Sequence, residues 1–454
     1  MPPLLASCIT FAAILWLLAR ERHWRSQYST GLWIPVGWIA IVGSRPLSSW
    51  FGLAPADASS EGSPFDRLIF IALILAGFII LQHRRVSWKS IIGGNKWLFL
   101  LLVYLGLSTL WADEPFVSFK RWIKELGNVV MVLVVLSEEN PAVAVKSVLF
   151  RCSVLLIPTS ALLIKYYPEL GRYYNPFNWT YSYGGVTTDK NALGMTLFIG
   201  TMGLYWGVYD LWQQRSKHWP EVLAHIVLLG ICLWLYIQAN CATSLTCAAL
   251  GIGILSAMKM PAFPNALQRI RLWGLLILAV VALLAFAAFN PLQLVTESLG
   301  RNLTLTGRTD IWREALQVPL NPLIGAGYCN FWQPEWAETI SQALGFYFNL
   351  KEAHNGYLEV YLNSGLIGLA LIVMVILSGI RNIIAALEPN GSYGAFRLAI
   401  LAGAILYNVT ESAFSGLVLL WVAFMLVVME PPRSPEAIEI NAIEPELEEN
   451  TPPA

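Results

Sequence analysis

The chain has 454 residues, of which 56% are hydrophobic and only 13% are charged, and its formal net charge is zero. Soluble domains usually carry about twice this charged fraction, so the composition excludes a chain of soluble domains, and the neutral balance gives no sign of a nucleic-acid partner. The cysteines are scattered and form no CxxC pair, so we predict neither a disulfide framework nor a cysteine-based metal site.

Apolar runs recur along the chain at about the length that a membrane-spanning helix needs. In lipid, such segments must be helices because every backbone group has to be satisfied internally. We therefore predict an all-α, polytopic membrane protein with about 12 or 13 transmembrane helices, the first of them retained rather than cleaved as a signal peptide. The runs are 3–19, 32–44, 67–82, 97–112, 126–137, 146–165, 191–211, 222–238, 242–258, 272–289, 354–379, 395–408 and 410–429.

Basic residues predict the orientation, because cytoplasmic loops carry an excess of Lys and Arg. They gather in alternate short loops, which places the N-terminus outside and the C-terminus in the cytoplasm. The residues are Arg20, Arg22, Arg25, Arg84, Arg85, Lys89, Lys96, Arg215, Lys217, Lys259, Arg269, Arg271, Arg381 and Arg397.

This orientation divides the chain into five parts. N-terminal helices (1–112) precede central helices (113–289), which carry outer segments 113–126 and 165–190. A large outer loop (290–353), C-terminal helices (354–429) and a disordered, acidic, Pro-rich cytoplasmic tail (430–454) complete the chain. Long ordered loops are usually functional, so we expect the chemistry at the outer face.

The segment DEPFVSFKRWIKEL (113–126) predicts an interfacial helix that begins near Pro115 and leads into the next span. Its polar face carries Lys120, Arg121 and Lys124, against the usual bias of positive charge towards the cytoplasm. These cations either reach towards lipid phosphates or bind an anionic, lipid-linked substrate.

The segment GGVTTDKNALG (184–194) predicts a tight turn at Gly184 and Gly185, followed by a helix that Thr188 or Asp189 caps. Lys190 then lies at a helix N-terminus, where a cation and free N–H groups both favour an anion. A capped helix start with no ligand is the simpler interpretation.

The segment TGRTDIWREALQVPLNPLIGAGYCNFW (306–332) predicts a helix with Thr309 at its N-cap, and a turn at Gly325 and Gly327. Arg308 precedes that cap, and its guanidinium either binds two phosphate oxygens or pairs with Asp310 or Glu314. The following segment, 334–350, has Trp336, Ile340, Leu344 and Tyr347 on one face, so we expect a helix that lies on the membrane surface.

His354 is the one histidine that this topology places at the outer face, at the start of an apolar helix. An ionisable residue there is a candidate for function, although a histidine at a helix start is more often a cap. Asn355 and Glu359 lie with Asn363 on a polar stripe beside it, so they are candidate substrate-binding residues.

Three motifs, TTDKNALG (187–194), GRTDIW (307–312) with NPLIGAGYCNFW (321–332), and HNGYLEVYLNSGLIGL (354–369), together resemble the O-antigen ligase family of bacterial membrane proteins. The outer segment WADEPFVSFKRWIKELG (111–127) is similar too. The resemblance covers about residues 110–380 and is strongest to the exopolysaccharide polymerase branch. It implies the helical C-type glycosyltransferase fold and an active site at the periplasmic side of the inner membrane.

The resemblance also implies the substrate and the site. The donor is expected to be a glycan on undecaprenyl diphosphate, the acceptor a glycan or another lipid-linked glycan, and no metal or cofactor is expected. Arg308 matches the family's loop arginine at the donor diphosphate, Lys190 the basic residue of a Lys-Asn pair, and His354 the histidine beside the reacting centre. The family often has His where this chain has Asp189, and an Arg in the 240 region where this chain reads NCATSLT.

These residues predict an inverting, metal-independent transfer. Arg308 and Lys190, with Arg121 or Lys124, would stabilise the departing diphosphate, and neutral His354 would accept the proton of the incoming hydroxyl. The alternatives are a ligase that moves the glycan to lipid A core or protein, a transporter of lipid-linked sugars, and a non-catalytic scaffold. Membrane lipids and polysaccharide assembly proteins are further expected partners.

Overall fold

A computed structural model describes residues 1–24, 29–53, 63–175, 180–213, 219–257, 308–387 and 392–432. The predicted span 272–289, part of the predicted loop 290–353 and most of the predicted tail lie outside the described residues.

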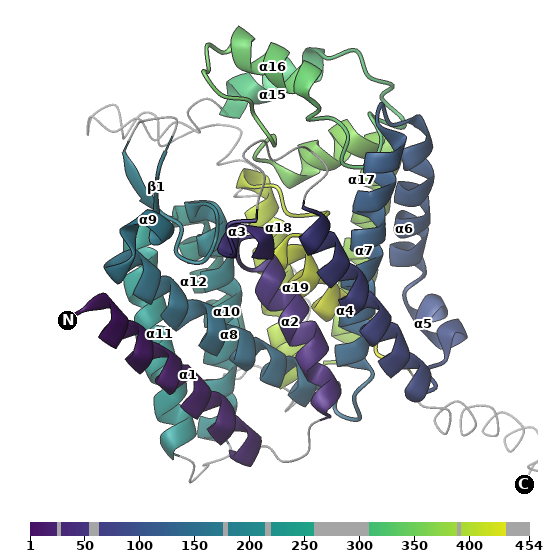
Figure 1. Ribbon diagram of the computed structural model, residues 1–454. Coiled ribbons are helices and arrows are strands. Elements are labelled where there is room, and N and C mark those ends of the chain that lie inside the picture. Colours follow the sequence, from purple (N-terminus) through teal and green to yellow (C-terminus); the bar gives the residue numbers. More distant parts are fainter. Residues whose placement is uncertain are drawn as a thin grey trace, which may run out of the picture.

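The described residues form a bundle of helices with one small hairpin (Figure 1). The first half comprises α1 (Pro3–Trp24), the 3₁₀ turn η1 (Thr30–Leu32), α2 (Trp33–Val42), α3 (Leu47–Trp50), α4 (Pro64–His83), α5 (Trp88–Gly94), α6 (Lys96–Ser108), the 3₁₀ turn η2 (Thr109–Trp111), α7 (Pro115–Leu136), α8 (Pro141–Tyr166) and α9 (Pro168–Gly171). The second half comprises β1 (Arg172–Tyr174), β2 (Tyr181–Tyr183), α10 (Lys190–Gln213), α11 (Trp219–Ala239), α12 (Ala242–Ala257), α15 (Arg308–Gln317), α16 (Pro334–Ala343), α17 (Gly356–Ala385), α18 (Ser392–Thr410) and α19 (Leu419–Val428).

Among the described residues, seven helices are long and apolar enough to cross a membrane: α1, α4, α8, α10, α11, α17 and α18. Helices α5 and α6 together make an eighth candidate, bent by 93° at Asn95. The shorter apolar helices α2, α12 and α19 coincide with further predicted runs. The prediction of an all-α, polytopic membrane protein is therefore confirmed.

Local signals explain where several of these helices begin. Ser63 and Asn140 are N-caps whose side chains accept hydrogen bonds from the backbone N–H groups of Phe65 and Val143, and a proline follows each cap at the first helical position. Pro115 likewise opens α7, as predicted.

Three details differ from the predicted elements. The interfacial segment and the run 126–137 form one continuous helix, α7, because nothing in the sequence breaks the backbone hydrogen bonding between them. The last run is helical only from Leu419, because residues 411–418 form a loop that folds back over the bundle. A two-stranded antiparallel hairpin, β1–β2, lies inside the predicted outer segment 165–190.

The second surface helix is also shorter than predicted. Helix α16 ends at Ala343, because Gly345 adopts a positive φ of 72° and reverses the chain. Ile340 is buried on the inner face of α16, whereas Tyr347 lies beyond the helix and is 98% exposed. Of the four residues predicted to share one helical face, only Trp336 and Ile340 lie within α16.

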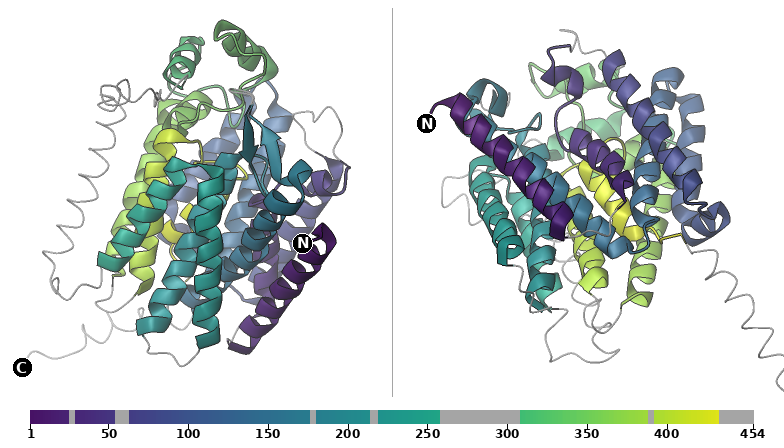
Figure 2. Two further views of the ribbon diagram at one scale, coloured as in Figure 1. Left: turned by 90° about the vertical axis from the view of Figure 1, so that its left-hand side faces the viewer. Right: turned by 60° about the horizontal axis from the view of Figure 1, so that its bottom comes forward.

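Helices α8, α10 and α18 form the buried centre of the bundle, and α1 packs against its outside (Figure 2). The hairpin, α3, α15 and α16 all lie at one end of the bundle, which we call the loop end (Figure 1). Ile311, Phe331, Ile340 and Leu362 form a separate small apolar core that fastens α15 and α16 to the start of α17.

Candidate active site

A cavity of about 410 Å³ opens at the loop end, between the first turn of α10, the end of α18 and the loop that follows it. Its volume lies within the range of about 300–1,000 Å³ that is typical of ligand sites. Charged and polar side chains from separate parts of the sequence line it, among them Lys124, Asp189, Asn191, Glu352, Tyr407 and Glu411.

Glu411 is the centre of the polar network at this cavity. It follows the last residue of α18, and only 5% of its side chain is exposed. One carboxylate oxygen accepts a hydrogen bond from an Arg308 guanidinium nitrogen at 2.8 Å. The other accepts from the Asn191 side-chain amide at 3.0 Å and lies 3.2 Å from His354 Nδ1. A buried carboxylate needs such partners, because leaving it unpaired would be costly.

Arg308 reaches this network from the first residue of α15. Besides Glu411, its guanidinium donates to the backbone carbonyl of Thr410. The predicted alternative, pairing with Asp310, is wrong, because Asp310 instead pairs with the exposed Arg313 at 3.0 Å. Thr309 lies inside α15 rather than at its cap.

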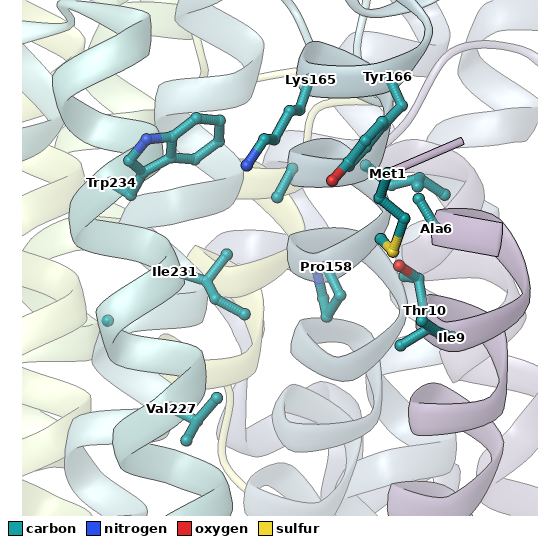
Figure 3. Close-up of a pocket in the computed structure, with 13 residues that line it drawn as sticks. Met1, Ala6, Ile9, Thr10, Pro158, Lys165, Tyr166, Val227, Ile231 and Trp234 are labelled. Carbon is teal, nitrogen blue, oxygen red and sulfur yellow. The ribbon is translucent and has the colours of Figure 1, made fainter. Parts of the chain in front are cut away.

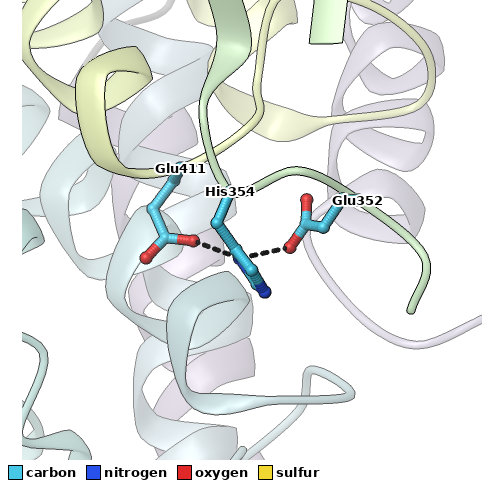
Figure 4. Close-up of side chains that lie close together, drawn as sticks. All are labelled: Glu352, His354 and Glu411. Atoms are coloured by element: carbon cyan, nitrogen blue, oxygen red, sulfur yellow. Dashed lines mark hydrogen bonds and ion pairs between the residues drawn. The ribbon is translucent and has the colours of Figure 1, made fainter. Parts of the chain in front are cut away.

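His354 lies between two carboxylates (Figure 4). Its Nδ1 is 3.0 Å from Glu352 and 3.2 Å from Glu411, and the other ring nitrogen points away from both. Its backbone adopts a positive φ of 51°, an uncommon conformation for a non-glycine residue and one that is often found at functional sites.

The surroundings of His354 favour its charged form. Burial lowers the pKa of His354, but the hydrogen bonds and negative charges of Glu352 and Glu411 outweigh burial and raise the pKa to about 10. A pKa raised in this way favours the imidazolium at neutral pH, in contrast to the neutral imidazole expected from the sequence.

The neighbours of His354 hold its loop in place. Asn355 is the N-cap of α17: its side chain accepts from the backbone N–H groups of Tyr357 and Leu358 at 3.0 Å, and its own N–H donates to Ser412. Asn355 was predicted to bind substrate, but its side chain is used as a helix cap.

Glu359 has a similar structural role. One carboxylate oxygen accepts from Trp332 and from the backbone N–H of Ala353, next to His354, at 2.9 and 3.0 Å. The other oxygen accepts from Asn363 at 2.9 Å. The predicted polar stripe therefore fastens the His354 loop to the loop before α16, and the contact of Glu359 with substrate stays a prediction.

The predicted cap at the start of α10 is confirmed. Asp189 Oδ1 accepts from the backbone N–H groups of Asn191 and Ala192 at 2.9 and 3.0 Å, and Gly185 takes the positive φ of the predicted turn. Lys190 donates its backbone N–H to Tyr173, but its side chain does not line the cavity. From this motif, Asn191 is the residue that the fold brings to Glu411.

The cations predicted on α7 are separated by the fold. Lys124 lines the cavity together with Glu352 and Glu411, whereas His354 and Arg308 are not part of its lining. Arg121 does not line the cavity, and its guanidinium donates to the backbone carbonyl of Cys329, so it fastens α7 to the loop before α16.

Glu352, His354 and Glu411 also form the one group of described residues whose spacing could suit a metal ion, with their ligand atoms within 4.8 Å of one another. We interpret this group as an ion-pair cluster. With Arg308 and the imidazolium of His354, the two carboxylates are already neutralised, so the residues present do not call for a cation.

Sequence reasoning missed Glu352, Asn191 and Arg45. Arg45 donates to the backbone carbonyls of Leu170, Gly185 and Thr187, so it holds the turn before α10. Arg45 lies between two short helices and belongs to no motif, so the sequence does not predict its contacts with the turn before α10. Glu411 was visible as an acid in an apolar run, but its partners depend on the fold.

Comparison with known proteins agrees with this arrangement. Residues 191–373 match the family model described as O-antigen ligase, a stretch that includes Asn191, Arg308 and His354 and ends before Glu411. The chain is also similar to the exopolysaccharide production protein ExoQ of Rhizobium meliloti (strain 1021), with 26% identity over 309 residues, which cover 64% of this chain and 67% of the relative. With its polytopic helical fold, the chain therefore resembles the O-antigen ligase-like membrane proteins.

Proposed function

We propose that this chain is an inverting, metal-independent glycosyltransferase that polymerises an oligosaccharide carried on undecaprenyl diphosphate, at the periplasmic face of the inner membrane. The similarity to an exopolysaccharide production protein favours a polymerase of exopolysaccharide or O-antigen. The observation that carries the proposal is the cluster of Arg308, His354, Glu352 and Glu411 beside a cavity at one end of the bundle.

Transfer from a lipid diphosphate needs positive charge where the leaving group departs. Arg308 and the imidazolium of His354 would supply it from beside the cavity, where they pair with Glu411 and Glu352, and Lys124 lines the cavity itself. In the absence of substrate, Glu411 pairs with Arg308 and with His354, and Glu352 pairs with His354. In a bound complex, the phosphate oxygens of the diphosphate would take the place of carboxylate oxygens as negatively charged acceptors for Arg308 and His354.

The incoming sugar hydroxyl needs a proton acceptor, and an imidazolium cannot accept a proton. Glu352 is the better candidate, because 39% of its side chain is exposed and it lines the cavity. The hydroxyl oxygen bonds to the anomeric carbon as the bond from that carbon to the diphosphate oxygen breaks. The bonding pair leaves with the diphosphate, and the hydroxyl proton passes to Glu352.

A ligase that moves the finished glycan to lipid A core or protein is the alternative within the same chemistry. Mass analysis of glycans in a deletion strain separates the two. Single repeats that remain on carrier lipid support the polymerase, whereas long chains that stay on the carrier and lack their final acceptor support the ligase.

A transporter of lipid-linked sugars is the alternative from another class. Transporters tend to hold their ionisable residues near the middle of the membrane, at broken helices. Here Arg308, His354 and Glu411 lie at the first residue of α15, before α17 and after α18, so all three lie at helix ends. This position fits chemistry on a substrate that reaches the protein from one side.

A further inference from the structure

A second cavity, of about 510 Å³, lies between α1, α8 and α11, away from the candidate active site (Figure 3). It shares no lining residue with the cavity at Glu411. All three helices are long and apolar enough to cross a membrane, so a groove between them would face the bilayer. The role of this groove is therefore independent of the proposed glycosyl transfer.

Small side chains create the groove. Ala6 on α1, Pro158 and Ala161 on α8, and Gly230 on α11 line it where larger residues would fill the space. A Cβ atom added at Gly230 would meet nothing within 4 Å. Val227 and Ile231 continue the apolar wall along α11 (Figure 3).

One end of the groove is polar and aromatic. Lys165, in the last turn of α8, reaches across the opening towards Trp234, with Tyr166 beside it (Figure 3). Trp and Tyr are enriched at the level of lipid headgroups, and a lysine there attracts phosphate. Among the described residues, no carboxylate pairs with Lys165, and none lines the groove.

We propose that this groove binds one anionic phospholipid of the surrounding bilayer, with an acyl chain along Pro158 and Gly230 and the headgroup phosphate at Lys165. The apolar wall suits a hydrocarbon chain, and the ammonium group of Lys165 at the headgroup end favours negative charge. The bound lipid would fill the space between α1 and α11, since α1 is otherwise held mainly by α8.

The test is native mass spectrometry of the purified full-length protein, incubated with an equimolar mixture of phosphatidylglycerol and phosphatidylcholine. The wild type should retain one phosphatidylglycerol. Lys165→Gln should lower the preference for phosphatidylglycerol about fivefold, because it removes one lysine from an anionic headgroup. Gly230→Leu should remove the retained lipid, because its side chain fills the groove.

Gly253→Leu is the matched control. Gly253 lies on α12, is exposed, and also has nothing within 4 Å of an added Cβ, so this variant should keep the lipid. If Gly230→Leu does not fold, Val227→Trp fills the same groove from an exposed position. Lipid retention that is equal in the wild type and the groove variants would overturn the proposal, as would displacement of phosphatidylglycerol by undecaprenyl phosphate.

Discussion

Glu411 shows how a single acidic residue organises the candidate site. Its carboxylate joins α10, α15 and the His354 loop, three segments that are far apart in the sequence. The pairing keeps each cation in place while no donor is bound. It also accounts for the raised pKa of His354, since two carboxylates lie against the same ring nitrogen.

Arg308 should be essential in a way that a neighbouring arginine is not. Arg308→Ala should lower the transfer rate about 10²–10³-fold, the usual effect of removing one group that stabilises a developing charge. Arg313 belongs to the same helix, but its side chain is 66% exposed and pairs only with Asp310 among the described residues, so Arg313→Ala is the matched control. Equal effects of the two substitutions in a lipid-linked glycan extension assay would exclude a specific role for Arg308.

The raised pKa of His354 predicts a particular pH dependence. If the imidazolium is the active form, the transfer rate stays constant through neutral pH and falls as the pH rises through about 10. Glu411→Gln removes one of the charges that raise this pKa, so the fall should move to lower pH. A rate in the wild type that instead climbs steadily with pH would identify neutral His354 as a base.

The same pKa shift has a consequence for stability. A histidine whose pKa is higher in the folded state stabilises the fold fully below its ordinary pKa of 6.5, and this stabilisation is lost as the pH rises through about 10. The wild type should therefore lose thermal stability between pH 6.5 and about pH 10, and His354→Gln should lose less over the same range. Thermal unfolding in detergent measures this difference. An unchanged profile would show that His354 is not charged in the folded protein.

At the residue scale, the sequence motifs singled out Arg308 and His354, which the fold brings to one carboxylate, but they do not give the charge of His354. Their positions follow from motifs, whereas the charge of His354 depends on Glu352 and on Glu411, which is 57 residues further along the chain. Asn355 and Glu359 were correctly placed beside His354 on a polar stripe. Spacing does not predict their hydrogen-bond partners, which are backbone N–H groups for Asn355, and Trp332, Asn363 and the Ala353 N–H for Glu359.

At the scale of elements, two features of α17 position the loop that carries His354. Asn355 caps its start, so Asn355→Ala should cost about 1 kcal/mol of stability, whereas Asn355→Ser, another good cap, should retain most of it. Thermal unfolding of the two variants measures this difference. Equal losses would mean that Asn355 acts through something other than its cap.

The second feature is a break at Gly365, where φ is 64° inside the helix. Residues 322–326 fill the break, since Leu366 and Ile367 donate to the carbonyls of Pro322 and Leu323 at 2.9 and 3.1 Å. This junction connects the loop before α16 to the helix that carries His354. The motif NPLIGAGYCNFW (321–332) therefore supplies the residues that pack against α17 at Gly365.

Gly365→Ala should destabilise the protein by about 1–3 kcal/mol from the backbone conformation alone. The cost should be higher still, because a Cβ atom would lie 2.2 Å from the Leu323 carbonyl. Gly253→Ala in α12 is the control, and it should be neutral or stabilising. Equal unfolding temperatures for the two variants would show that the break is not required.

Helix periodicity predicted most elements well, because apolar runs and caps are local. It failed at the loop 411–418, whose apolar residues read as part of the following span. The hairpin β1–β2 lies inside the predicted outer segment 165–190, for which helix periodicity predicts no strands. The turn before α10 depends on distant contacts too, namely the Arg45 hydrogen bonds to the carbonyls of Gly185 and Thr187.

At the scale of the whole molecule, the predicted topology places the loop end outside the cytoplasm. Tyr347 is 98% exposed there, so Tyr347→Cys should react with a membrane-impermeant maleimide added to intact spheroplasts. A cysteine at Lys89, on α5 near the opposite end, should react only after the membrane is opened. The reverse pattern would invert the orientation and move the site to the cytoplasm.

The number of spans shows the limit of hydropathy at this scale. Helix α7 carries Lys120, Arg121, Lys124 and Glu125, so it does not qualify as a span by composition although it packs within the bundle. Helix α19 is short for a bilayer yet buried along its whole length, and α2 is short and partly buried. Burial by protein neighbours and burial by lipid give the same apolar pattern, so hydropathy alone does not distinguish them.

The central claim is that the cluster at Arg308 and His354 transfers sugar from a lipid diphosphate. The most direct measurement supplies undecaprenyl-diphosphate-linked oligosaccharide to the purified protein in proteoliposomes and follows the length of the glycan by mass spectrometry. We predict lengthened glycan with the wild type and with Arg313→Ala, and unchanged glycan with Arg308→Ala. Glycan that stays at its original length with the wild type while crossing the bilayer would contradict the account.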